Sequence, residues 1–263
     1  MDLQLQKKAA LVLAGSKGLG RAIATELARE GASVIIASRD EEQLEQTVGE
    51  IKKDIGGGEV QYAICDLTNE DDVKAAVQKT ADQYGTVDIL INNSGGPKAG
   101  GFDDVNASDW QNAYELNLLS YVRATEAVLP YMKKQQNGRI VNITSSSIKE
   151  ALDGMVLSNT FRAGVLGLTK SLASEYASDN IFVNTIGPGR IATDRVASLD
   201  ELKASKQNKD RETVREESEA RIPAGRYGEP EEFAKTVVFL ASQANSYVTG
   251  EAMLVDGGLV KAL

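Results

Sequence analysis

A glycine-rich turn, Gly15-Ser16-Lys17-Gly18-Leu19-Gly20, is the clearest place for chemistry in this sequence. It follows a short apolar run at 9–14 and leads directly into a segment with helical periodicity at 18–30. Glycines permit a tight turn and the close approach of a ligand to the backbone, while the first N–H groups of a helix and its dipole attract an anion. The pattern therefore predicts a site for the pyrophosphate of a dinucleotide at the start of this helix.

Ser38-Arg39-Asp40 follows the next apolar run, where a dinucleotide site reads the adenosine ribose. An acidic residue there accepts a hydrogen bond from the ribose of NAD, whereas an arginine can hold the 2′-phosphate of NADP with two donors. Arg39, reinforced by Lys17, favours NADP(H), while Asp40 keeps NAD(H) open as the alternative. The two cations could also be ordinary solvated surface groups.

Two more polar stretches follow predicted strands. Asp66-Leu67 offers a carboxylate to an adenine amino group, and Asn92-Asn93-Ser94-Gly95-Gly96 offers amides and glycines to a ribose. Each stretch alone is also typical of a loop turn. Together they mark the crevice at the carboxyl ends of the strands, where open α/β sheets bind ligands.

The elements that must position these groups alternate along the chain. Seven short apolar runs are predicted strands, and six longer segments between them have helical periodicity. The strands are expected at 9–14, 33–38, 59–64, 87–92, 139–144, 181–186 and 252–256, and the helices at 18–30, 41–54, 70–84, 108–135, 157–177 and 230–242. This alternation predicts an α/β fold with a doubly wound, seven-stranded parallel sheet of Rossmann type, in a single domain over 1–263. The segment 194–220, dense in charges of both signs, is expected to be a mobile helical insertion at the edge of the sheet.

Composition narrows the classes of function. The formal net charge of −9 opposes binding to nucleic-acid phosphates or anionic lipid. The absence of histidine excludes His-based triads and imidazole metal ligands, and the single Cys65, at the end of a predicted strand, is expected to be a core thiol rather than a nucleophile. Because the sequence shows no apolar run long enough for a membrane span and no signal-peptide pattern, a cytoplasmic protein is expected.

From the glycine-rich turn to the carboxyl end, the sequence resembles the short-chain dehydrogenase/reductase family, in particular its 3-oxoacyl-[acyl-carrier-protein] reductases. The stretches that carry the resemblance are the glycine turn, Asn92-Asn93-Ser94-Gly95, 139–143, 163–172, 183–184, 187–193, 222–226, 230–232, 247–250 and 255–258. The resemblance implies a nicotinamide cofactor, hydride transfer to or from a carbonyl or alcohol carbon of a small molecule, and a homotetramer or homodimer. It also places 194–220 where the family has its substrate lid. The cofactor contacts it implies are Gly15, Ser16, Lys17, Gly18, Leu19, Gly20, Arg39, Asp66, Leu67, Asn93, Ser94, Gly95, Arg162, Pro188, Gly189, Ile191 and Thr193.

Family chemistry depends on four side chains, of which this sequence keeps two. Asn117 corresponds to the asparagine that holds a proton-relay water, and Ser145 to the serine that hydrogen-bonds the substrate oxygen. The tyrosine and the lysine four residues later are replaced by Ser158 and Arg162, which indicates a divergent subgroup without Tyr-x-x-x-Lys. A serine hydroxyl is shorter than a phenol and a much weaker acid. Arg162 can still bind the nicotinamide ribose, but a guanidinium does not release its proton.

Other groups could replace the missing proton donor. Tyr114 and Tyr121 flank Asn117 at i−3 and i+4, so one phenol could face the cleft, although such positions commonly pack against a neighbouring helix or subunit. The charged loop after Ser145 could line the substrate pocket or simply face solvent; its charged residues are Lys149, Glu150 and Asp153.

Cations in the 194–220 segment could meet an anionic substrate or an acidic carrier protein. They are Lys203, Lys206, Lys209, Arg211 and Arg215. The interleaved Glu201, Glu212, Glu216 and Glu217 favour instead a solvated, ion-paired helix.

Two functions fit this sequence. One is an NADP-dependent oxidoreductase in which the proton passes through water held by Ser145, Ser158 and Asn117, or through Lys149. The other is a pseudo-enzyme that binds NADPH without turnover and has a binding or regulatory role. Elimination or isomerisation on the same scaffold would need a carboxylate such as Asp153. The intact cofactor motifs favour the oxidoreductase, and the lost tyrosine favours the pseudo-enzyme.

Overall fold

Seven parallel strands form one sheet in the computed structural model, which describes residues 1–262. The sheet order is β3-β2-β1-β4-β5-β6-β7, so the direction of winding reverses between β1 and β4. The strands are β1 (Ala9–Leu13), β2 (Ser33–Ser38), β3 (Val60–Ile64), β4 (Ile89–Asn92), β5 (Gly138–Ile143), β6 (Ile181–Pro188) and β7 (Ala252–Val255). The predicted doubly wound α/β sheet is confirmed, and its switch point lies beside the glycine-rich turn.

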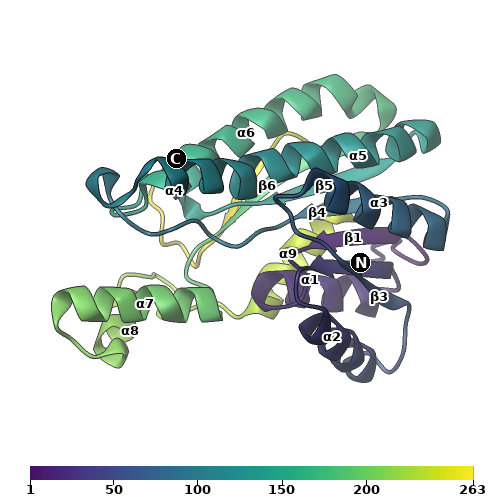
Figure 1. Cartoon of the computed structure of the whole chain (residues 1–263). Coiled ribbons are helices and arrows are strands. Elements are labelled where there is room, and N and C mark those ends of the chain that lie inside the picture. The colour runs from purple at the N-terminus through teal and green to yellow at the C-terminus, as the bar shows by residue number, and fades with distance from the viewer. Residues whose placement is uncertain (263) are drawn as a thin grey trace.

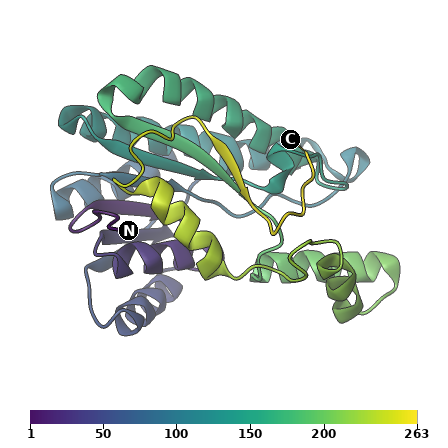
Figure 2. The same ribbon diagram turned by 180° about the vertical axis from the view of Figure 1, so that it is seen from behind.

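Helices cover both faces of the sheet (Figures 1 and 2). One face packs against α1 (Gly18–Arg29), α2 (Glu41–Asp54) and α9 (Pro230–Ala241), and the other against α3 (Glu70–Tyr84), α5 (Ser120–Gln135) and α6 (Val156–Tyr176). Successive residues of β1 enter the two cores in turn, with Val12 in the first and Leu11 in the second. Burial on both faces is why the strands read as continuous apolar runs in the sequence.

The helix predicted at 108–135 is interrupted by one wider turn. It consists of α4 (Ala107–Tyr114), a π-helical turn over Glu115–Leu119 and α5. Asn117 lies inside this turn and is fully buried, with its side chain directed at the loop that follows β4. Single π-turns inside α-helices are often found at functional sites.

The charged segment at 194–220 forms two helices, α7 (Asp194–Gln207) and α8 (Arg211–Glu219), which pack on each other beside the carboxyl end of the sheet (Figure 1). The segment is helical, and its mobility and its role as a substrate lid stay predictions. Asp200 attaches the pair to the rest of the fold, since it is 3% exposed and accepts hydrogen bonds from Arg190 Nη1 at 2.7 Å and Tyr227 Oη at 2.9 Å. No helix within residues 1–262 is both long enough and apolar enough to cross a membrane.

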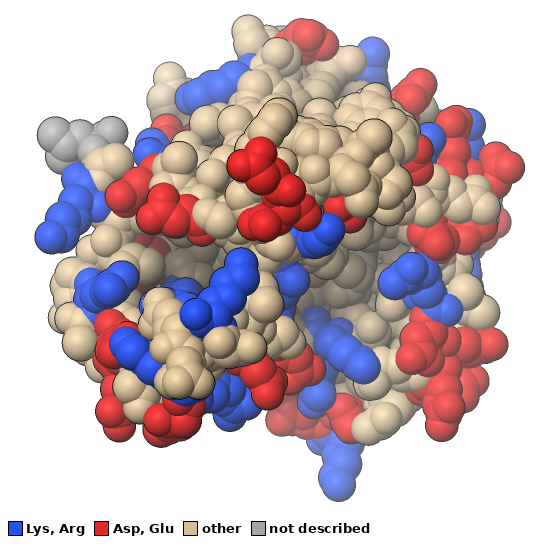
Figure 3. Space-filling model, turned by 60° about the vertical axis from the view of Figure 1, so that its left-hand side comes forward, with Lys and Arg blue, Asp and Glu red and all other residues tan. Residues whose placement is uncertain are grey.

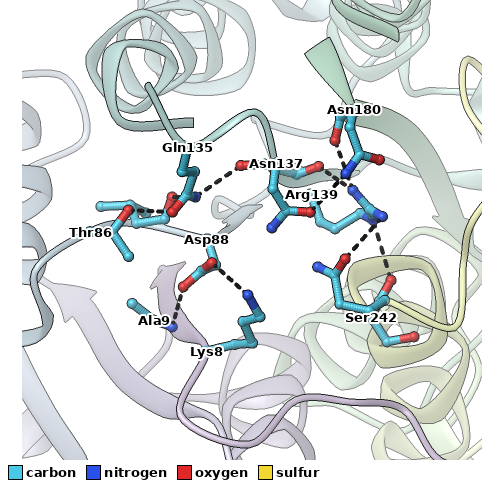
Figure 4. Close-up of polar contacts among 12 residues, drawn as sticks. Lys8, Ala9, Thr86, Asp88, Gln135, Asn137, Arg139, Asn180 and Ser242 are labelled. Carbon is cyan, nitrogen blue, oxygen red and sulfur yellow. Dashed lines mark hydrogen bonds and ion pairs between the residues drawn. The ribbon is translucent and has the colours of Figure 1, made fainter. Parts of the chain in front are cut away.

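Arg139 organises the opposite, amino end of the sheet (Figure 4). It is 2% exposed and its guanidinium sits 4.5 Å from the ring centroid of Phe182. Its donors reach uncharged acceptors, namely the carbonyl oxygens of Gly138, Asn180, Ser242 and Asn245 and the amide oxygen of Gln243. Burial lowers the pKa of Arg139 to about 10. These contacts lie away from the predicted crevice and serve the fold.

Candidate active site

The glycine-rich turn has the tight geometry that the sequence predicts. Gly18 has φ +52°, and a Cβ on Gly20 would lie 2.3 Å from the carbonyl oxygen of Ala14. A Cβ on Gly15 would lie 2.8 Å from Cβ of Ile36 in the neighbouring strand. Lys17, the N-cap of α1, makes no capping hydrogen bond through its side chain, so this side chain does not occupy the first N–H groups of the helix. The turn therefore has the free donors and the space that a phosphate needs.

The adenosine end of the crevice combines two cations with a polar floor. Arg39 and Lys17 are exposed, and Ser16 Oγ donates to Ser38 Oγ at 3.1 Å between them. Asp40, the residue that leaves NAD(H) open, caps α2 by accepting a hydrogen bond from the backbone N–H of Gln43 at 3.1 Å. Its carboxylate thus has a structural task, which strengthens the interpretation of Arg39 as the residue that meets the ribose.

Asp66 is held by its own loop. Its Oδ1 accepts from the backbone N–H and the hydroxyl of Thr68, at 2.9 Å and 2.8 Å. Burial opposes its ionisation, but the Thr68 hydrogen bonds and the charge of Arg39 together lower the pKa of Asp66. The neighbouring Leu67 is 6% exposed and packs in the core. An ionised Asp66 has acceptor capacity left for an amino group.

The loop after β4 divides between core and crevice. Asn92 points into the core, where its Nδ2 donates to Asn142 Oδ1 at 2.8 Å and to Thr125 Oγ1 at 3.3 Å. Asn93 crosses to the glycine turn and donates to Ala14 O at 3.3 Å. Ser94 continues toward the predicted catalytic residues. Asn92 is therefore part of the buried support between strands, and the ligand-facing part of the loop starts one residue later.

The segment after β6 closes the other side of the glycine turn. Thr193 caps α7, and its Cγ2 is 3.6 Å from the place where Gly18 would carry a Cβ. Pro188 ends β6, Gly189 packs so closely that a Cβ would lie 2.5 Å from Cβ of Asp256, and Ile191 is 3% exposed. Of these four predicted contact residues, Thr193 is the one that an observed contact brings to the glycine turn.

Asn117 and Arg162 meet around Ser94. Asn117 Nδ2 donates to Ser94 Oγ at 2.9 Å and to Gly95 O at 2.7 Å, and Arg162 Nη2 lies 3.5 Å from the same Ser94 oxygen. Asn117 Oδ1 and Arg162 Nε are buried without a partner among the described residues. Buried polar atoms without partners are rare in folded proteins, so both are candidates for contact with a ligand or a water.

Tyr121 is buried against Arg162. Its hydroxyl donates to the carbonyl oxygen of Ile143 at 2.7 Å and accepts from Arg162 Nη1 at 3.0 Å. Arg162 is 4% exposed, although it occupies the place where the resemblance implies a lysine. The structure therefore pairs a phenol with this cation, but the phenol comes from α5 and its proton is used in a hydrogen bond to the backbone.

The serines are close together without forming one open cluster. Ser145 is half-buried and its Oγ accepts from the backbone N–H of Ser147 at 3.2 Å. Ser158 is 4% exposed, and its Oγ lies 3.4 Å from Ser147 Oγ. Ser147 thus links the two predicted catalytic serines, a contact that no local sequence signal indicates.

The alternative proton donors are placed differently from one another. Tyr114 is 37% exposed, and its ring centroid is 6.2 Å from that of Phe161 on α6, so it packs between helices. Lys149, Glu150 and Asp153 are exposed in the loop before α6. The thiol of Cys65 is fully buried, and burial, with a smaller effect of Asp72 and Asp66, raises its pKa to about 12, which confirms a core thiol.

Two cations of the 194–220 segment form ion pairs. Lys209 contacts Glu217, and Arg215 Nε lies 2.9 Å from Glu219 Oε1. The ion-paired character predicted for this segment is confirmed at these positions. Figure 3 shows that the surface above the α7–α8 pair is hollowed, with Lys and Arg side chains along the lower side of the hollow and Asp and Glu side chains on its upper rim.

Arg195 is a site residue that sequence reasoning missed. It comes from the first turn of α7 and its Nη2 donates to Pro97 O at 2.7 Å, across the crevice. Partial burial and the positive charge of Arg162 lower the pKa of Arg195. The one available signal was a cation two residues after Thr193, at the entrance to the lid segment.

Comparison with known proteins shows which family this sequence matches. The family model described as "Enoyl-(Acyl carrier protein) reductase" matches residues 13–260. The 3-oxoacyl-[acyl-carrier-protein] reductase FabG of Thermotoga maritima is 36% identical over 260 residues, which cover 98% of this chain and 100% of the relative. The FabG of Vibrio cholerae is 37% identical over 257 residues, covering 98% of this chain and 99% of its own.

Solved structures are similarly close. YwfH, described as an NADPH dependent reductase involved in bacilysin biosynthesis, superposes with a TM-score of 0.93 at 31% identity, covering 98% of this chain and 100% of that one. L-Sorbose reductase from Gluconobacter frateurii, solved with NADPH and L-sorbose, has a TM-score of 0.93 at 30% identity, with 100% of both chains covered.

Proposed function

Because the chain belongs to the short-chain dehydrogenase/reductase family, we propose that it is an NADP(H)-dependent oxidoreductase acting on a carbonyl or alcohol carbon of a small molecule. The observation that carries the proposal is the convergence of the glycine turn, Thr193 and the Asn117–Ser94–Arg162 network on one crevice. Relatives described as NADPH-dependent, at 30–31% identity over nearly the whole chain, support the choice of cofactor.

NADP(H) fits the residues on both sides of the crevice. The uncapped first turn of α1 would hold the pyrophosphate, and Arg39 with Lys17 would hold the 2′-phosphate by charge-assisted hydrogen bonds. Asp66 would accept from the adenine amino group. At the other end, the unpartnered Arg162 Nε is available to the nicotinamide ribose. When bound, the cofactor supplies or takes up the hydride.

The protein groups must then position the substrate and move one proton. Ser145 is half-buried at the carboxyl end of β5 and would hydrogen-bond the substrate oxygen. Asn117, with its unpartnered Oδ1, would hold the water that exchanges a proton with this oxygen, and Ser158 would support the same path through Ser147. Lys149, exposed in the adjoining loop, is the alternative donor. Arg162 contributes positive charge near the developing alkoxide without giving up a proton.

A pseudo-enzyme that binds NADPH in a regulatory role is the second candidate. It is favoured by the state of the Tyr121 hydroxyl, which donates to Ile143 O at 2.7 Å. Ser158, in the place of the family tyrosine, is buried at 4% exposure. The proposed oxidoreductase therefore relies on water for a step that a phenol performs in the family.

Turnover in a matched pair of proteins tests the proposal. Wild type and the double variant Ser158→Tyr with Arg162→Lys are assayed for NADPH oxidation against a panel of ketones, sugars and acyl thioesters. Turnover by the wild type supports an active oxidoreductase with its own proton path, whether the variant keeps this activity or loses part of it. Turnover by the variant alone, with NADPH bound equally by both, supports the pseudo-enzyme.

The proposal includes a homotetramer or homodimer, as the family resemblance implies, and a location in the cytoplasm. Light scattering coupled to size-exclusion chromatography measures the mass directly. A monomer of 28.2 kDa at micromolar concentration would contradict this part of the proposal.

A further inference from the structure

Arg195 extends from the lid over the loop after β4. Its Nη2 donates to Pro97 O at 2.7 Å, and a Cβ on Gly96 would lie 2.8 Å from Arg195 Nε. The glycine thus leaves room for the guanidinium to lie flat against the backbone. In the same loop, Gly95 O accepts a hydrogen bond from Asn117 Nδ2, and Ser94 Oγ lies 3.5 Å from Arg162 Nη2. Residues 94–97 therefore bring two arginines from different elements to one short stretch of chain.

These two positive charges have no negative partner in the part of the chain that the structure describes. Neither guanidinium is in an ion pair with a carboxylate. Arg162 is 4% exposed and its hydrogen bonds go to uncharged oxygens of Tyr121, Ile143 and Ser94. The charge of Arg162 contributes to a lowered pKa at Arg195, so the two repel each other. Arg162 is buried whereas Arg195 is exposed, and an anion that contacts both guanidiniums would offset the repulsion between them.

The positive charge of Arg162 and Arg195 is a local feature, since the formal net charge of the whole chain is −9. Lys and Arg side chains gather along the lower side of the hollow in Figure 3, while Asp and Glu side chains stand on its upper rim, so the positive potential is concentrated on one side of the hollow. The cofactor phosphates account for part of this potential at the glycine turn and at Arg39. Arg195 lies beyond that region, on the Gly96–Pro97 side of the crevice, next to Asn117 and Arg162.

We propose that Arg195, together with Arg162, binds a carboxylate on the substrate, so that the protein acts on oxo acids or hydroxy acids. The inference rests on the proposed oxidoreductase function and specifies its substrate class. Arg195 would supply the charge-assisted hydrogen bonds, and its place on the first turn of α7 would couple substrate binding to the position of the lid. Such bonds discriminate strongly, since a neutral ester leaves the guanidinium unpaired.

Binding of oxo acids and their methyl esters to the NADPH-saturated protein tests the inference without requiring turnover. Isothermal titration compares pyruvate with methyl pyruvate and levulinate with methyl levulinate. The two pairs differ in the spacing between carbonyl and carboxylate, which the structure does not fix. At least one acid is expected to bind about tenfold to a hundredfold more tightly than its ester. Arg195→Met should abolish the difference and Arg195→Lys should retain part of it.

Arg211→Met is the matched control, since Arg211 is an exposed cation on α8 of the same lid and its loss changes the net charge equally. It should leave the acid preference intact. NADPH affinity should be unchanged in all these variants, and circular dichroism should show equal melting temperatures.

The inference is overturned if acid and ester bind equally, if neither binds at about 10 mM, or if the preference survives Arg195→Met. A loss of NADPH affinity in Arg195→Met as large as the loss for the acid would instead assign this arginine to the cofactor. If the wild type fails to bind NADPH, the proposed function fails. The same acid and ester titrations on the protein without NADPH then show whether Arg195 still binds a carboxylate.

Discussion

Substitution of Gly20 by alanine is expected to destabilise the protein and weaken NADPH binding. The added Cβ would lie 2.3 Å from Ala14 O and 2.8 Å from Asn93 Nδ2. Neither atom can yield easily, because the first belongs to the backbone and the second donates to it at 3.3 Å. Relief of the clash therefore requires a shift of α1 away from the end of β1. That shift moves the N–H groups proposed to bind pyrophosphate.

The size of the effect follows from two opposing contributions. Because the nearest atom belongs to the backbone and lies only 2.3 Å away, the overpacking cost falls in the upper part of the usual range, about 2–3 kcal/mol, and the helix propensity of alanine over glycine returns about 1 kcal/mol. A net destabilisation of about 1–2 kcal/mol corresponds to a melting temperature lower by roughly 2–8 °C for a domain of this size. Gly49→Ala is the matched control, since it lies in α2 with no atom within 4 Å of the new Cβ. It should stabilise the protein by about 0.5–1 kcal/mol.

Differential scanning fluorimetry and NADPH titration, at one protein concentration for all samples, measure both quantities. Opposite shifts of the melting temperature are expected for the two variants, with weaker NADPH binding only for Gly20→Ala. Equal melting temperatures, or unchanged NADPH affinity in a destabilised Gly20→Ala protein, would refute the reasoning from the close approach of α1 to β1.

Further predictions concern the cofactor, the core thiol and the lid. Arg39→Ser should weaken NADPH binding about tenfold to a hundredfold with little change for NADH, as titrations of both cofactors would show. Because the pKa of Cys65 is raised from 9.0 to about 12, the unfolded state loses this proton first as pH rises above 9. The contribution of the Cys65 proton to the free energy of unfolding is complete below pH 9 and declines above it. Urea denaturation at pH 8 and pH 10 should therefore show a smaller loss of stability for Cys65→Ala than for the wild type. Asp200→Asn should destabilise the lid by about 3 kcal/mol, giving faster tryptic cleavage within 194–220; unchanged cleavage would contradict the anchoring role of Asp200.

The fold could be predicted almost completely because its elements carry strong local signals. Buried parallel strands read as apolar runs, and the glycine turn needs glycine at positions where a side chain would collide. Local signals also marked the break inside the lid: Asp210 caps α8, and an aspartate before a helical run is a common start signal. The prediction of a single segment over 194–220 lacks this break.

The details of the site could not be predicted, because they depend on contacts between distant residues. The π-helical turn at Asn117 has no residue signature, and it is paired with a loop more than twenty residues earlier. The burial of Tyr121 against Arg162 and the reach of Arg195 to Pro97 depend on side-chain direction after the sheet has formed. Residue types identified the chemistry available, and packing decided which groups meet.

The central claim is that the crevice is an NADP(H) site that persists without the family tyrosine. Isothermal titration of the wild-type protein with NADPH and NADH tests it most directly. We expect NADPH to bind in the micromolar range and NADH to bind at least about tenfold more weakly. The difference arises because a charge-assisted hydrogen bond to the 2′-phosphate is worth about 1.5–3 kcal/mol. Absence of NADPH binding at about 1 mM, or equal affinity for the two cofactors, would contradict it.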